Sequence, residues 1–167
     1  LGGTEEVVRL AERLGAPVVT GDGAKGAFPE AHPLSLGPAL GRRLWGENPV
    51  QEWLGTCDLA LVLVANLPYR STVGVGLKLP KTVVHVLLDG EAIGKNYPTS
   101  IPIVANSRAV ATQLLEGIGE RDVYKGDSYR REIEGLRERI YLSLKEKWGR
   151  ELGTFEAIRA VTPRDTI

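Results

Sequence analysis

Three short apolar runs constrain the fold of this chain more than any other feature. They occupy residues 59–64 (LALVLV), 83–88 (VVHVLL) and 101–105 (IPIVA). Runs that are continuously apolar, rather than alternating, are typical of parallel strands covered on both faces. A shorter run at 17–20 (PVVT) is bounded by turn residues and predicts a further buried strand.

Helical patterns separate these runs. Apolar residues recur at helical spacing over residues 4–14, with Thr4 as the expected cap and Gly15 as the stop. A second helix is expected to be capped by Ser107 and to follow the 101–105 run. Strands that alternate with helices predict an α/β fold, a Rossmann-like doubly wound parallel sheet with helices on both faces.

The last third of the chain has a different pattern. From Ser128 to about Leu152 it is highly charged and predicts one long amphipathic helix. We expect this helix to pack on its own domain or on a neighbouring one, with a coiled-coil partner as the alternative. Thr154 is expected to cap a separate short helix over residues 155–160. The apolar stripe of the long helix consists of Ile133, Leu136, Ile140, Leu144, Trp148 and Leu152.

Composition excludes several classes of partner. The chain has 167 residues, and its 21 Lys and Arg balance its 21 Asp and Glu, so no net charge favours nucleic acid or an anionic membrane. No apolar run approaches the length of a membrane span, about 20 residues. The single cysteine, Cys57, suits a reducing cytoplasm. Methionine is absent, even at position 1, which indicates a fragment of a longer protein.

Several segments together resemble one family. Residues 14–20 (LGAPVVT) lead into 25–37 (KGAFPEAHPLSLG), and 57–66, 85–98 and 101–108 continue the likeness. From the start of the chain to about residue 118, the sequence is similar to the central domain of thiamine-diphosphate-dependent enzymes, the superfamily of acetolactate synthase, pyruvate oxidase and benzoylformate decarboxylase. The resemblance implies a sheet of about six strands. The family's first strand would precede Gly2 and Gly3, so we expect the chain to start at that strand's end.

The resemblance also implies a domain organisation and a role. Residues 1–120 would be the Rossmann-like central domain, 121–153 a linker helix packed on it, and 154–167 the start of the following diphosphate-binding domain. The chain would be a non-catalytic scaffold between pyrimidine-binding and diphosphate-binding domains. The parent enzyme would act on a 2-oxo acid with thiamine diphosphate and Mg²⁺, and would be a homo-oligomer. The alternatives are a free-standing FAD- or ADP-binding module and an interaction domain that uses the long helix.

A ligand of such a sheet would lie at the carboxyl ends of the strands. The resemblance implies a FAD or ADP site there, and the sequence departs from the FAD-binding pattern. The FAD-binding segment is replaced at 37–41 (GPALG), and Leu87 stands where the family has an aspartate. We therefore expect no cofactor in this chain and a vestigial site at most. Its residues would be Gly26, Ala65, Asn66, Asp89 and Asn106.

No catalytic residue and no metal ligand is expected. Gly21-Asp22-Gly23 with Asn48 resembles the magnesium motif of thiamine-diphosphate enzymes. The expected helix does not follow Asp22 and no strand precedes Asn48, so a tight turn is the preferred interpretation. His32 and His85 have no second histidine or cysteine at ligand spacing.

Overall fold

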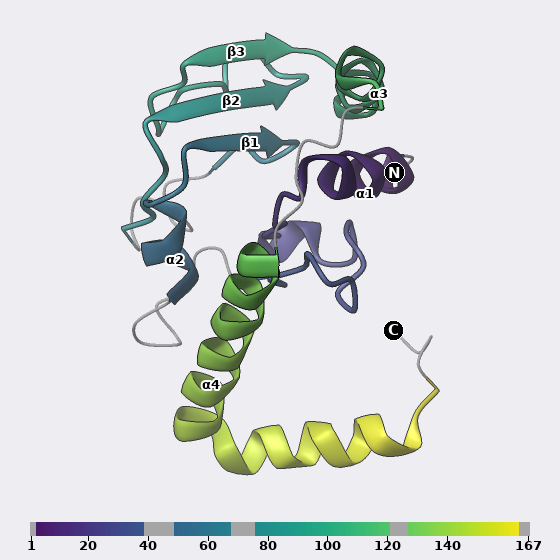
Figure 1. Ribbon diagram of the computed structural model, residues 1–167. Coiled ribbons are helices and arrows are strands. Elements are labelled where there is room, and N and C mark those ends of the chain that lie inside the picture. The colour runs from purple at the N-terminus through teal and green to yellow at the C-terminus, as the bar shows by residue number, and fades with distance from the viewer. Residues whose placement is uncertain (1–2, 39–48, 68–75, 121–126, 164–167) are drawn as a thin grey trace.

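The computed structural model describes residues 3–38, 49–67, 76–120 and 127–163, with the side chains of 22 and 127–129 left out. A three-stranded parallel sheet forms its centre, in the order β1 (Leu59–Leu63), β2 (Thr82–Leu87) and β3 (Ile101–Val104) (Figure 1). The three apolar runs are thus parallel strands, as predicted. Pro102 lies in β3, an edge strand of this sheet, where a missing N–H donor is tolerated.

The 17–20 run forms a smaller element than predicted. Val18 makes an isolated parallel bridge with Ser35, supported by backbone hydrogen bonds from Val18 N to Leu34 O (2.8 Å) and from Leu36 N to Val18 O (2.9 Å). Thr20 N continues the pairing to Gly37 O at 3.0 Å. Within the described residues this pair is not joined to β1–β3. The α/β parallel class is therefore observed, with fewer strands than the resemblance implies.

Helices α1 (Thr4–Leu14) and α3 (Ser107–Ile118) pack against each other. The apolar stripe of α1 points inward, with Leu10 and Ala11 buried, and α3 buries Val110 and Ala111. α1 ends at Gly15, whose φ of 62° lies in the left-handed region that favours glycine.

Both predicted helix caps were wrong by one residue. Gly3, not Thr4, precedes α1 as its N-cap, and it supplies no side-chain hydrogen bond. Asn106, not Ser107, caps α3, because its side chain accepts from the backbone N–H groups of Arg108 and Ala109. Asparagine and serine are about equally good caps, so composition alone does not choose between neighbours.

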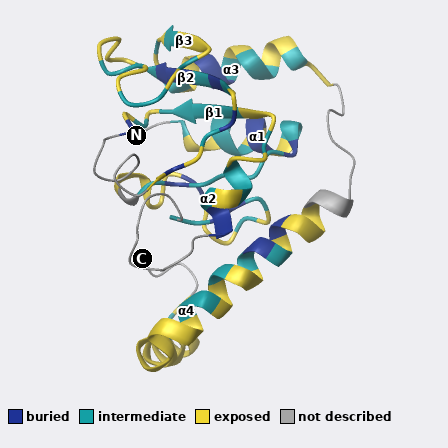
Figure 2. Ribbon diagram, turned by 90° about the vertical axis from the view of Figure 1, so that its left-hand side faces the viewer, coloured by how far each residue is buried: buried dark blue, intermediate teal, exposed yellow. Residues whose placement is uncertain are grey.

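The short helix α2 (Pro49–Leu54) and the long helix α4 (Asp127–Val161) share a core. Leu36, Val50, Ile133 and Leu136 form it, each at most 5% exposed. Arg137 of α4 reinforces this docking, since its guanidinium donates to the backbone oxygens of Ser35 (2.8 Å), His32 (2.7 Å) and Glu30 (3.4 Å). The first half of α4 thus packs on the rest of the chain through Ile133 and Leu136 (Figure 2).

The second half of α4 differs from the prediction. The helix does not restart at Thr154 but runs on to Val161, with a bend at Trp148. Thr154 lies inside the helix, and its hydroxyl donates to Arg150 O at 3.2 Å. The predicted stripe is buried only near its start, because Trp148 is already 42% exposed. No helix in the described ranges is long and apolar enough to cross a membrane.

Candidate functional site

The carboxyl edge of the sheet brings together most of the predicted site residues. Ala65 and Asn66 follow β1, Asp89 follows β2, and Asn106 follows β3. Because the three strands are parallel and adjacent, these residues lie at one edge. This is the edge where open α/β sheets bind ligands.

The chain leaves β1 in an unusual conformation. Val64 and Leu67 have φ values of 62° and 45°, a left-handed geometry that side chains with a Cβ rarely adopt. Two hydrogen bonds hold this turn: His85 Nε2 donates to Ala65 O at 2.8 Å, and Asn96 Nδ2 donates to Leu67 O at 2.8 Å. Such strain persists only where surrounding contacts fix it.

His85 is 2% exposed, so its bond to Ala65 O is shielded from water. The acceptor is a carbonyl, so Nε2 carries the proton in this arrangement. The imidazole therefore positions the turn after β1. Its position inside an apolar strand was visible in the sequence, but its partner, 20 residues away, was not.

Asp89 and Asn106, which follow β2 and β3, form hydrogen bonds with backbone N–H groups two or three residues further along the chain. Asp89 Oδ1 accepts from Glu91 N at 3.0 Å, and Asn106 Oδ1 accepts from Arg108 N at 2.9 Å and Ala109 N at 3.4 Å. The Asn106 oxygen caps α3 and is not directed at a ligand. Asn66 and the Asp89 carboxylate are both exposed at this edge, and the carboxylate disfavours an anionic group nearby.

The N-termini of α1 and α3 meet at this edge. A Cβ built on Gly3 would lie 3.3 Å from the Arg108 Cβ, so the first turns of the two helices are side by side. Helix N-termini carry partial positive charge and are the usual place for a phosphate. This pairing of the first turns of α1 and α3 was not predicted from the sequence.

The one guanidinium in these first turns is already paired. Arg108 Nε donates to Glu6 Oε1 at 2.7 Å. The pKa of Glu6 is lowered, first by a backbone hydrogen bond at its own position and next by the hydrogen bond from Arg108. The Glu6 carboxylate thus already pairs with the cation to which a phosphate would otherwise bind.

Gly26 follows none of the strands β1–β3 but belongs to the loop of the Val18–Ser35 pair, which is not joined to this sheet in the described residues. It is exposed, has a φ of 82°, and follows the one-turn helix η1 (Asp22–Ala24) on the loop between the two paired segments. At the start of this loop, Thr20 is 8% exposed and its Oγ1 has no hydrogen-bond partner among the described residues. Asn48 and the Asp22 side chain, considered above as a magnesium pair, lie outside the described residues.

The comparisons with known proteins agree with this architecture. The family model for the thiamine pyrophosphate enzyme central domain matches residues 1–114. A probable acetolactate synthase large subunit of Methanocaldococcus jannaschii is 33% identical over 118 residues, which is 70% of this chain and 20% of that protein. The acetolactate synthase of Mycobacterium bovis is 36% identical over 114 residues, 67% of this chain and 18% of that protein.

A longer match includes α4. The sulfoacetaldehyde acetyltransferase of Rhodobacter capsulatus is 34% identical over 155 residues, which is 90% of this chain and 25% of that protein. The chain thus spans a quarter or less of the length of these curated relatives. With a family match over most of the chain and a parallel α/β sheet, the chain belongs to the family of thiamine pyrophosphate enzyme central domains.

Proposed function

We propose that this chain is the non-catalytic central domain of a thiamine-diphosphate-dependent carboligase or decarboxylase, related to acetolactate synthase, and that it serves as a scaffold. The observation that carries this proposal is the family match over residues 1–114. Thiamine diphosphate and Mg²⁺ would be bound by neighbouring domains of the same polypeptide. The whole protein would be a cytoplasmic homo-oligomer acting on a 2-oxo acid.

The carboxyl edge of the sheet supports a vestigial nucleotide site. Of its polar groups, Arg108 is paired with Glu6, the Asn106 oxygen caps α3, and the Asp89 carboxylate would repel a diphosphate. A bound FAD or ADP would have to displace these contacts. Each displaced contact would lower the affinity unless the ligand replaced it.

We also propose that the complete sheet has about six strands. The Val18–Ser35 pair and β1 are both parallel elements, and β1 has no neighbour on its outer side among the described residues. The apolar face of α1 is only partly covered, since Val7, Val8 and Leu14 are half-buried. One further parallel strand between the pair and β1 would join them and cover this face.

The domain boundaries belong to the same proposal. Residues 1–120 would form the central domain, 121–153 its docked linker and 154–167 the start of the next domain. Two relatives whose matches are long enough to reach well into α4 are sulfoacetaldehyde acetyltransferases, with 155 and 159 aligned residues. Their names extend the range of parent activities to acetyl transfer.

A free-standing nucleotide-binding module is the second candidate. It is favoured by one observation, the two helix N-termini that meet beside the strand ends. Binding measurements separate the two. We expect calorimetry with this chain to detect no binding of thiamine diphosphate, and none of FAD or ADP at micromolar concentrations. Micromolar FAD or ADP binding that Asp89→Ala alters would support the nucleotide-binding module instead.

The scaffold role has its own test in the whole enzyme. Asn66→Ala and Asp89→Ala in the full-length protein should leave kcat and KM unchanged, because neither side chain would touch substrate or cofactor. Loss of turnover in either variant, with the fold intact by circular dichroism, would contradict the proposal.

A further inference from the structure

The two halves of α4 are held very differently. The proximal segment, residues 127–147, is anchored to the domain by the buried side chains Ile133 and Leu136 and by Arg137. Trp53 Nε1 also donates to Glu132 Oε1 at 3.0 Å. The distal segment, residues 149–161, is exposed at nearly every position and extends away from the sheet (Figures 1 and 2).

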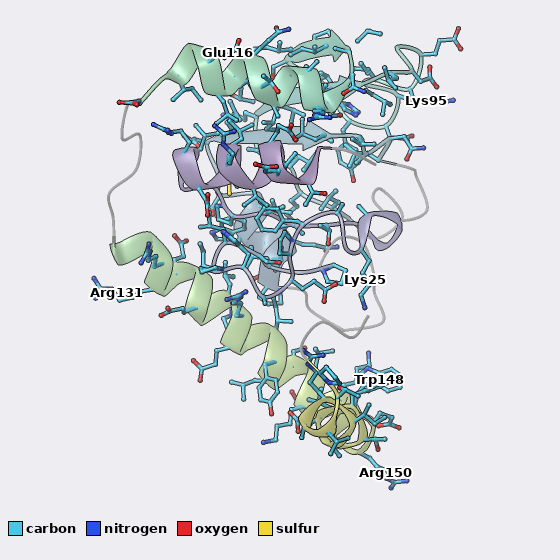
Figure 3. The ribbon with its side chains drawn as sticks, turned by 90° about the vertical axis from the view of Figure 1, so that its right-hand side faces the viewer. Lys25, Lys95, Glu116, Arg131, Trp148 and Arg150 are labelled. Carbon is cyan, nitrogen blue, oxygen red and sulfur yellow. The ribbon has the colours of Figure 1, made fainter. Side chains whose placement is uncertain are left out.

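The segments meet at a bend. Trp148 has φ −130° and ψ 33°, outside the helical region, and Gly149 follows it. Glycine weakens a helix because it has the greatest backbone freedom to lose. Figure 3 views the distal segment nearly end-on, with Trp148 and Arg150 beside the bend. The backbone of Trp148 alone departs from helical geometry, so a helical Trp148 would give a straight α4 as the alternative conformation.

One side-chain contact distinguishes the bent form from a straight one. Tyr141 OH donates to Glu156 Oε1 at 2.8 Å across the bend, although the two residues are 15 positions apart. In a straight helix their Cα atoms would be about 22 Å apart, too far for any contact. The ammonium of Lys145 lies 5.9 Å from the centroid of the Tyr141 ring, so a cation–π contact also involves this side chain.

We propose that Tyr141 and Glu156 form a latch that holds α4 bent at Trp148, and that opening the latch allows the helix to straighten. A contact shifts a conformational equilibrium only if the two states differ in it, and this one exists only in the bent state. The latch thereby sets the direction of the distal segment. That segment carries the exposed apolar side chains Phe155 (68%), Ile158 (52%) and Val161 (83%). The latch does not depend on the proposed function.

Distance measurements between spin labels test the latch. Labels on cysteines at positions 138 and 157, both exposed, would be about 28 Å apart at the Cα atoms in a straight helix and closer in the bent one. The background is Cys57→Ser, which removes the single native thiol. We expect the short distance to predominate in the parent protein, with a measurable minor population at the long one.

Two variants should move the population to the long distance. Tyr141→Phe removes only the hydroxyl, and Glu156→Ala removes the acceptor; each should raise the straight-to-bent ratio about two- to tenfold, as expected for one exposed hydrogen bond. Glu151→Ala, an exposed carboxylate on the same segment, is the matched control and should change nothing. A parent protein already at about 28 Å, or a Tyr141→Phe variant with the parent's distribution, would overturn the latch.

Discussion

The docking of α4 can be tested with two leucines on the same helix. Leu136 is 4% exposed and packs in the cluster with Leu36, Val50 and Ile133, whereas Leu142 is 54% exposed. Truncation of a buried leucine to alanine removes its transfer free energy and leaves a cavity, at a total cost of about 2–5 kcal/mol. Truncation of an exposed one changes stability by no more than about 0.5 kcal/mol.

Urea denaturation at fixed pH gives the comparison. For an m-value of about 2 kcal/mol/M, a loss of about 3 kcal/mol in Leu136→Ala lowers the midpoint by about 1.5 M. Leu142→Ala should shift it by less than about 0.3 M. Equal midpoints would refute the inference that the proximal half of α4 belongs to the core. If α4 instead detaches before the sheet unfolds, tryptophan fluorescence and far-ultraviolet circular dichroism will show separate transitions.

Three further predictions concern the polar contacts. Arg137→Ala should destabilise the fold by about 1–3 kcal/mol in urea denaturation, and Arg137→Lys should recover only part of this, because lysine lacks the planar fork that reaches several carbonyls. Asn106→Ala should cost about 1 kcal/mol through loss of the α3 cap while Asn106→Asp costs little; equal losses would exclude a capping role. The folded-state pKa of Glu6 is depressed below the ordinary value of a glutamate, so its contribution to stability is present above the unfolded pKa and lost as the pH falls through the folded one. The stability difference between the parent and Glu6→Gln, followed by thermal melts from pH 7 to pH 3, should therefore shrink as the pH falls; a constant difference would show that the ionised Glu6 carboxylate contributes nothing to stability.

Part of the fold could be predicted because it depends on local pattern. The continuous apolar side chains of the runs at 59–64, 83–88 and 101–105 are shielded from water only if both faces of the strands are covered. In the structure these runs form parallel strands. The buried strand predicted at 17–20 is observed only as the Val18–Ser35 bridge in the described residues, since a strand this short depends on its neighbours for pairing. The cap positions failed for the same reason that the bend at Trp148 was missed. Each depends on one backbone angle that neighbouring packing decides.

For the site, order along the chain placed Ala65, Asn66, Asp89 and Asn106 at strand ends, and parallel strands put those ends on one edge. The contacts that decide what this edge can do link residues far apart in sequence. Glu6 reaches Arg108 over 102 positions, and His85 reaches the carbonyl of Ala65 over 20.

The amino-acid sequence by itself determined the parallel α/β class and the family, because apolar periodicity and short segment patterns are properties of neighbours along the chain. The tertiary structure alone decided that the guanidinium at the carboxyl edge of the sheet is paired with a carboxylate, and that the long helix packs on the domain over only its first half. Both outcomes depend on contacts between residues that are far apart in the sequence, and spacing along the chain does not reveal such contacts.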